Sequence, residues 1–124
     1  MRIKRVFISF DFEEDRALRD LLIGQSKNDI CPFEVIDSSL HEAAPEKDWE
    51  EKAKNKIKTA DLVIILLGPH TYRAPGVLKE IKIARELGRK MVQVIGYKNG
   101  KYQRIPQAGI LYRWTWNNLE KILC

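Results

Sequence analysis

Glu80 is the residue of this 124-residue chain whose position most clearly suggests chemistry. On a helical wheel at about 100° per residue, Val77, Ile81 and Ala84 form the apolar face of a helix predicted over residues 77–87. Glu80 falls inside that apolar arc, where a carboxylate needs a partner or a function. It also lies in the first turn, where the helix dipole favours a negative charge. Two interpretations therefore stay open: a catalytic or ligand-binding carboxylate, or a boundary glutamate paired with a basic side chain.

Further carboxylates follow two strand-like segments. Asp11 and Asp15 come after the apolar segment 5–10, and Asp37 ends the segment 32–37. Acidic side chains at strand ends could bind Mg²⁺ and accept a phosphoryl group, as in a receiver domain, if a late lysine completed the set. A phosphoacceptor domain is therefore one of three functions to be weighed.

Other familiar sites are not predicted. No serine or cysteine is clearly paired with His41 or His70, so a catalytic triad is not expected. The chain contains neither a dinucleotide-binding GxGxxG nor a Walker sequence. Its two cysteines, Cys31 and Cys124, are too few for a disulfide scaffold or a metal site, so we expect reduced thiols in the cytoplasm.

The elements that must position Glu80 alternate between strand-like and helix-like from end to end. The expected strands are 5–10, 32–37, 62–67, 90–95 and 111–116, and the expected helices are about 16–27, 48–60, 77–87 and 117–123. The unbroken apolar run 62–67 is typical of a central parallel strand covered on both faces. Trp114 and Trp116 would share one face of the last strand and belong to the core.

Such alternation predicts a single α/β domain over residues 1–124, because parallel strands need crossover connections. We expect a flavodoxin-like, three-layer domain with strand order 2-1-3-4-5 and helices on both faces. Ligands then bind at the carboxyl ends of the strands, near the point where the order reverses. Phe10, Asp37 and Leu67 lead into the loops at that edge.

Charge and hydropathy exclude several classes of protein. The net charge of +5 comes from 22 basic and 17 acidic residues, which favours an anionic partner such as a nucleotide, although solubility alone would explain it. No nucleic-acid-binding pattern is evident. The longest apolar run, 62–67, is far short of the roughly 20 residues of a membrane helix. Since nothing at the N-terminus resembles an export signal, the expected location is the cytoplasm.

Four short segments, taken in order, resemble the Toll/interleukin-1 receptor (TIR) domain family. Phe7-Ile8-Ser9-Phe10 is similar to the family's first strand, and residues 33–37 are similar to its second strand with a terminal aspartate. Residues 61–68 resemble the central strand, and Val77-Leu78-Lys79-Glu80-Ile81 resembles the segment that opens the third helix. The pattern is closest to the bacterial and archaeal TIR-like branch, which contains the TIR-like proteins of Thoeris anti-phage systems.

The resemblance implies chemistry on NAD⁺. Catalytically active TIR domains cleave the bond between nicotinamide and ribose, and some cyclise or re-ligate the ADP-ribose into a signal nucleotide. The family's catalytic glutamate corresponds to Glu80. Phe10 corresponds to an aromatic residue that could pack on the substrate, and Asp11 and Asp37 are further substrate-binding candidates. No metal is implied, and no cofactor besides the substrate NAD⁺.

The implied function is that of an NAD⁺ nucleosidase or ADP-ribosyl cyclase whose ADP-ribose-derived product serves as an anti-phage defence signal. The implied partners are NAD⁺, further copies of the chain, and a separate effector protein that senses the product. Self-association is expected because many TIR domains act only when assembled. The alternative is a non-catalytic signalling module with the same fold that binds other proteins.

Overall fold

The computed structural model describes residues 3–12, 14–28, 31–36, 46–97 and 100–124. Their elements are, in order, β1 (Lys4–Ser9), α1 (Arg16–Gln25), β2 (Phe33–Ile36), α2 (Glu46–Lys58), β3 (Leu62–Leu67), the 3₁₀ helix η2 (Thr71–Arg73), α3 (Pro75–Glu86), β4 (Met91–Ile95), β5 (Ile110–Arg113) and α4 (Trp116–Leu123). The predicted alternation is confirmed, although α2 and α3 each begin two residues earlier than expected. Pro75 explains the earlier start of α3, since it stands at the first position of that helix, which suits a proline.

The five strands form one parallel sheet in the order β2-β1-β3-β4-β5, as the sequence predicts. β1 pairs with β2 on one side and with β3 on the other, from Val6↔Leu62 to Ser9↔Ile65. The chain order therefore reverses next to β1. In open parallel sheets this reversal places ligand sites at the carboxyl ends of the adjoining strands.

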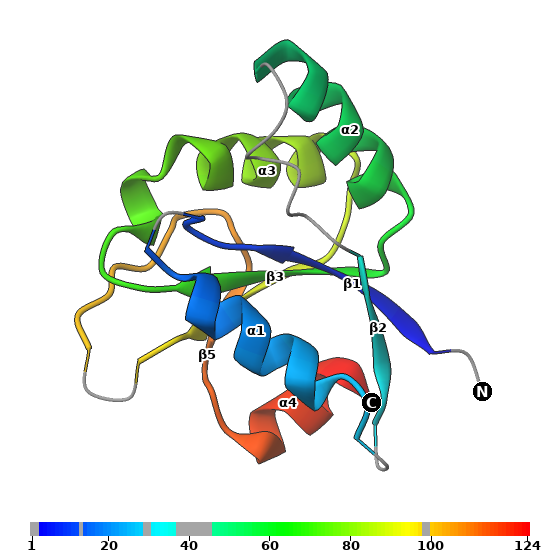
Figure 1. Cartoon of the computed structure of the whole chain (residues 1–124), viewed down its shortest axis with the longest axis vertical. Helices are drawn as coiled ribbons and strands as arrows, with labels where there is room; N and C mark the ends of the chain where they lie inside the picture. The colour runs from blue at the N-terminus through cyan, green and yellow to red at the C-terminus, as the bar shows by residue number, and fades with distance from the viewer. Residues whose placement is uncertain (1–2, 13, 29–30, 37–45, 98–99) are drawn as a thin grey trace.

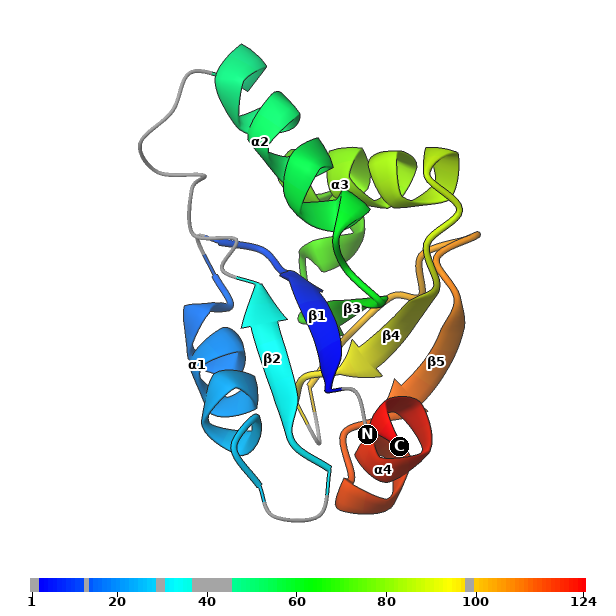
Figure 2. The ribbon, with the colours of Figure 1, turned by 90° about the vertical axis from the view of Figure 1, so that its right-hand side faces the viewer.

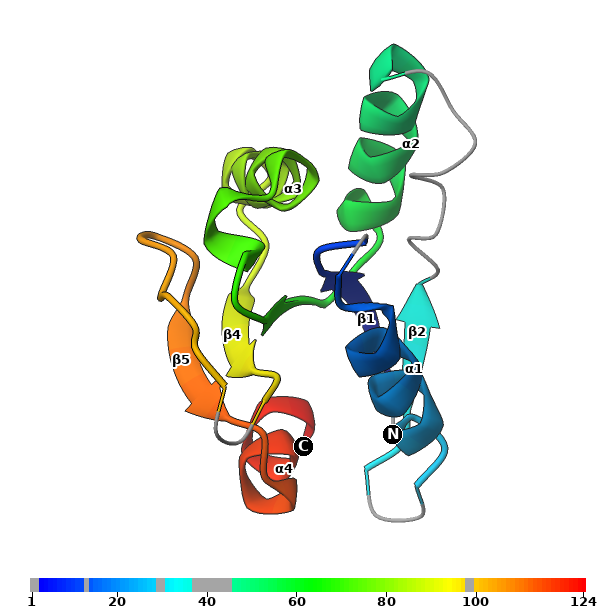
Figure 3. The ribbon, with the colours of Figure 1, turned by 60° about the vertical axis from the view of Figure 1, so that its left-hand side comes forward.

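Helices cover both faces of the sheet. α2 and α3 lie on one face, and α1 and α4 lie on the other (Figures 1, 2 and 3). All six residues of β3 are buried, because this strand lies between the two helical layers. Its side chains alternate between the layers: Ile64 packs in the cluster that contains Leu18 and Leu119, whereas Ile65 packs in the cluster that contains Ile81.

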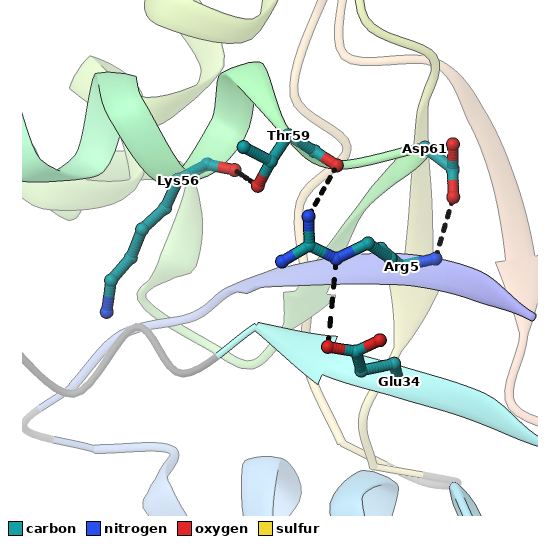
Figure 4. A network of polar contacts seen from close by, with 5 residues as sticks. All are labelled: Arg5, Glu34, Lys56, Thr59 and Asp61. Carbon is teal, nitrogen blue, oxygen red and sulfur yellow. Dashed lines mark hydrogen bonds and ion pairs between the residues drawn. The ribbon is translucent and has the colours of Figure 1, made fainter.

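A polar network joins the strands near their amino-terminal ends (Figure 4). The Arg5 backbone N–H donates to Asp61 Oδ2 at 2.8 Å, and the Asp61 backbone N–H donates to the Arg5 carbonyl at 2.8 Å. The Arg5 guanidinium reaches the Thr59 carbonyl at 3.5 Å and Glu34 Oε1 at 3.7 Å. This network ties the end of α2 to β1 and β2.

The segment between β4 and β5 is held by a buried amide. Gln93 in β4 is fully buried, and its Nε2 donates to the carbonyls of Ile105 and Gly109 at 3.0 and 3.1 Å. The Ile105 N–H donates back to Gln93 Oε1 at 2.8 Å. The amide thereby stabilises the β4–β5 connection without needing a ligand.

The last strand is shorter than the sequence suggests. β5 ends at Arg113, and Trp116 is the first residue of α4 rather than a strand residue. The reason is an N-cap: the Thr115 side chain accepts a hydrogen bond from the Asn118 N–H at 3.1 Å, which starts the helix there. Trp114 and Trp116 are half-buried against the core, so their predicted packing role is confirmed although their strand assignment is wrong.

The prediction of reduced thiols is wrong for this structure, because Cys31 and Cys124 form a disulfide. The two residues are 93 positions apart in the sequence, yet their Cα atoms lie 5.9 Å apart. Distance along the chain did not indicate this pairing; the packing of α4 on the sheet brings the last residue beside the segment that precedes β2. Within the described part of the chain, every helix is too short or too polar to cross a membrane.

Candidate active site

Glu80 lies where the helical wheel predicts, on the face of α3 that packs on the sheet. Only 1% of the residue is exposed, and its neighbours on that face are Val77, Ile81 and Ala84. The Ser9 hydroxyl donates to Glu80 Oε1 at 2.9 Å. The carboxylate is therefore held at the carboxyl end of β1, next to the point where the strand order reverses.

Ser9 reaches Glu80 because of the alternation along β1. Phe7, two residues earlier, packs in the cluster under α2 and α3, so Ser9 faces the same side of the sheet. Ser9 is fully buried and stands in a strand that is otherwise apolar from Val6 onward. Ser9 is not among the residues predicted for the site, although a small hydroxyl residue at the last position of an apolar strand was a usable sequence signal.

Phe10 and Glu80 lie on opposite faces of the sheet. Phe10 is 3% exposed and packs with Leu18 in the cluster under α1 and α4. The Arg19 guanidinium lies 5.7 Å from the centroid of the Phe10 ring, and the Phe12 ring centroid lies 5.9 Å away. The substrate-binding role of Phe10 therefore stays a prediction, and a substrate would have to reach its ring around the edge of the sheet.

The two remaining predicted contacts lie on the loops that follow β1 and β2. Asp11 is half-buried at the start of the β1–α1 loop, where its carbonyl accepts the Asp15 N–H at 2.8 Å. Asp37 lies outside the described residues. Their proposed contacts with a substrate stay predictions.

A second buried carboxylate, Asp15, lies at the same edge of the sheet. It directly precedes α1 and is 1% exposed. The Tyr97 hydroxyl donates to Asp15 Oδ1 at 3.0 Å, and Thr71 Oγ1 lies 3.3 Å from Asp15 Oδ2. From the sequence, Asp15 is a candidate only for the acidic cluster of a receiver domain. Nothing local indicated its burial, because acidic residues at helix starts are usually solvent-exposed caps.

The environment of Asp15 changes its ionisation. Burial raises the pKa of the Asp15 carboxyl above its usual 3.8, and the nearby charges of Asp11 and Glu14 act in the same direction. The hydrogen bonds from Tyr97 and Thr71 oppose this rise in pKa. The pKa of Tyr97 is raised as well, first by burial and then by its contact with Asp15.

The described residues do not assemble a metal site. No group of three or more His, Cys, Asp or Glu side chains among them could hold a metal ion. The arrangement can instead supply an oriented carboxyl group: in its ionised form, a buried carboxylate held by a hydroxyl stabilises a cation that develops beside it. Such chemistry suits reactions whose transition state has oxocarbenium character.

Comparisons with known proteins agree with this architecture. A family model described as the TIR-like domain of Thoeris protein ThsB matches residues 7–100. Among solved structures, the fold is similar to a Clostridium botulinum CMP N-glycosidase, BcmB, with a TM-score of 0.59, 21% identity, and coverage of 97% of this chain and 94% of that chain. It is also similar to a prokaryotic SEFIR domain, with a TM-score of 0.58, 23% identity, and coverage of 95% and 92%. None of the curated proteins compared with the chain matches it.

Proposed function

Because the chain belongs to the TIR-like domain family of Thoeris ThsB proteins, we propose that it cleaves the N-glycosidic bond of NAD⁺ through Glu80. The observation that carries the proposal is the position of Glu80: a carboxylate that is 1% exposed, bonded to Ser9, at the carboxyl edge of a parallel sheet. Burying a carboxylate is costly, so its retention there favours a function.

The chemistry needs little besides this charge. The bond between nicotinamide N1 and ribose C1′ breaks, and its electron pair returns to the already cationic ring nitrogen, so no acid has to protonate the leaving group. Glu80 would stabilise the positive charge that develops on the ribose and position its hydroxyls. Water, or a hydroxyl of the ADP-ribose itself, then attacks C1′ and loses its proton to solvent. The products are nicotinamide and linear or cyclised ADP-ribose.

The fold comparison offers a second substrate for the same chemistry. The BcmB protein is described as a CMP N-glycosidase, and CMP, like NAD⁺, carries a base on a ribose C1′. Cytosine is a poorer leaving group than nicotinamide because it leaves uncharged only after protonation. NAD⁺ therefore requires no acid besides Glu80, which is why we propose it ahead of CMP.

The test is a mass-spectrometric assay of NAD⁺, with CMP in parallel, at several protein concentrations so that self-association is covered. We compare wild type, Glu80→Gln and Glu86→Gln, which changes an exposed glutamate on the same helix. Nicotinamide should form with wild type and Glu86→Gln, and the rate should fall at least about 100-fold with Glu80→Gln. Equal rates for all three proteins would eliminate Glu80 as the catalytic residue, whereas cytosine release alone would replace NAD⁺ by CMP.

A non-catalytic interaction module is the second candidate. The observation that favours it is the same burial, since the Ser9–Glu80 hydrogen bond would also serve to fasten α3 to β1. Absence of turnover at every concentration, together with unchanged self-association of Glu80→Gln in analytical ultracentrifugation, would support this candidate over the enzyme.

The proposed cellular setting follows from the enzyme. We expect copies of the chain to assemble for activity, and a separate effector protein to bind the ADP-ribose-derived product in anti-phage defence. The proposed location is the cytoplasm, and the Cys31–Cys124 disulfide is the observation that opposes it, because cytosolic thiols are normally reduced. Alkylation of the protein inside its host cell, followed by mass measurement, shows whether the two cysteines are reduced, as the cytoplasm requires, or joined in the disulfide.

A further inference from the structure

Asp15 is a buried carboxyl group that the proposed reaction does not use. Its side chain does not cap α1, although it occupies the N-cap position. It contacts Tyr97, which follows β4, and Thr71, which lies in η2 after β3. One side chain at the start of α1 therefore joins the segments that follow two different strands.

Two glycines create the space for this contact. Gly68 follows β3, and a Cβ atom there would collide with both carboxylate oxygens of Asp15. Gly96 follows β4, and a Cβ atom there would collide with Leu18, one turn further along α1. The first turn of α1 therefore packs directly against the residues that follow β3 and β4.

Thr71 connects this contact between α1 and the strand ends to α3. Its hydroxyl accepts the Gly68 N–H at 2.7 Å, and its carbonyl accepts the Ala74 N–H at 3.1 Å, immediately before α3 begins. The Ala74 carbonyl in turn accepts the Leu78 N–H in the first turn of α3. A short, fully bonded path therefore leads from Asp15 to the turn of α3 that precedes Glu80.

The Thr71 hydroxyl has a single proton and several acceptors within reach. Asp15 Oδ2 and the Leu66 carbonyl are each 3.3 Å away, and the Gly68 carbonyl is 3.4 Å away. When the Asp15 carboxyl is neutral, the hydroxyl can donate to a carbonyl and accept from Asp15 instead. The cluster is satisfied in either case, and an amide at position 15 would satisfy it too.

We propose that Asp15 is a positioning residue for the Glu80 site, holding η2 and Tyr97 against α1 so that α3 presents Glu80 at Ser9. The inference rests on the proposed function of Glu80. Buried polar groups that share partners act as a unit, because removing one leaves the others unsatisfied. Loss of Asp15 should therefore displace the start of α3, and a small displacement of a catalytic group lowers the rate steeply.

The test compares Asp15→Ala, Asp15→Asn and Tyr97→Phe with Tyr102→Phe, which removes the hydroxyl of an exposed tyrosine in the same connection. Two quantities are measured on each protein: kcat and KM for nicotinamide release, and hydrogen exchange of peptides that cover residues 68–80. We expect Asp15→Ala to lower kcat about 100-fold and Tyr97→Phe about tenfold, with little change in KM. Exchange in 68–80 should accelerate in both, while Asp15→Asn retains most of the wild-type rate and Tyr102→Phe matches wild type.

Each outcome either supports or overturns the positioning role of Asp15. Unchanged kcat and unchanged exchange in Asp15→Ala would overturn the proposal, as would equal losses in Asp15→Asn and Asp15→Ala. If Asp15→Ala does not fold, Tyr97→Phe and Asp15→Asn provide the same comparison. If wild type shows no turnover, the proposed function fails separately, and exchange alone then decides: faster exchange in Tyr97→Phe than in Tyr102→Phe supports the positioning role, and equal exchange overturns it.

Discussion

Polar side chains gather at both ends of the sheet, but under opposite conditions. At the amino-terminal end, the Arg5 and Glu34 side chains are 38% and 61% exposed and lie 3.7 Å apart (Figure 4). At the carboxyl end, Glu80 and Asp15 are each 1% exposed and have short hydrogen bonds to hydroxyl groups. Water screens the first group and is excluded from the second.

The difference separates two kinds of polar contact that a list of hydrogen bonds would treat alike. An exposed ion pair costs little and contributes little, so its presence requires no function. A buried carboxylate loses its hydration and must be held by donors, so it persists where its charge or its bonds are needed. The carboxyl end is therefore where we propose the functional site, and four substitutions test the contrast.

The largest expected effect on stability belongs to Gly68→Ala. The added methyl would overlap the Asp15 carboxyl, and overpacking of this kind costs about 2–3 kcal/mol of unfolding free energy. Gly24→Ala is the matched control, because nothing lies within 4 Å of a Cβ at that exposed position of α1. Gly24→Ala should raise the unfolding free energy by about 0.5–1 kcal/mol. Urea unfolding measures the unfolding free energy of both variants. Changes of the same sign would contradict the close packing of Asp15 against Gly68.

Ser9→Ala is expected to cost about 1–3 kcal/mol, because it removes a donor from a buried carboxylate. Thr59→Ala removes a hydroxyl that donates to the Lys56 carbonyl at the exposed end of α2, and should change the unfolding free energy by less than about 0.5 kcal/mol. Equal losses of unfolding free energy in the two variants, measured by thermal unfolding, would mean that burial does not distinguish the two ends of the sheet.

Asp15→Asn is expected to change how the unfolding free energy depends on pH. The folded protein raises the pKa of Asp15 and so binds a proton more tightly than the unfolded chain does. The unfolding free energy of wild type therefore falls as pH rises through the window that begins at the usual value of 3.8, and asparagine removes this contribution. The stability of Asp15→Asn relative to wild type should accordingly increase as the pH rises above 3.8. A relative stability that decreases over this range would contradict the raised pKa.

Glu34→Gln should have the smallest effect. Its ion pair with Arg5 is exposed, so the unfolding free energy should change by less than about 0.5 kcal/mol. A loss above about 1 kcal/mol in urea unfolding would show that the amino-terminal network is more than a screened surface contact.

Much of the fold followed from local patterns. The unbroken apolar run 62–67 correctly predicts a strand buried on both faces, and Gly88 adopts a φ of 68° just after α3, as a helix-ending glycine should. The wheel correctly predicts that Glu80 points into the core. These features depend on neighbours within a few residues, which is why periodicity reveals them.

The candidate site was less accessible to such reasoning. Phe10, the residue that follows β1, packs on the face of the sheet opposite Ser9, which the family resemblance did not indicate. The shortened β5 reflects competition between the strand and the Thr115 cap, which sequence preferences alone do not resolve.

By itself, the sequence determined the alternation of elements, the parallel sheet and the inward position of Glu80, because 3.6-residue and two-residue periods record which side chains avoid water. Only the tertiary structure decided which distant groups meet. Asp15 and Tyr97 are 82 positions apart, and Cys31 and Cys124 are 93 apart. Their contacts depend on how α1 and α4 pack on the sheet, and on the absence of a side chain at Gly68. No local pattern records that packing, because its partners come from opposite ends of the chain.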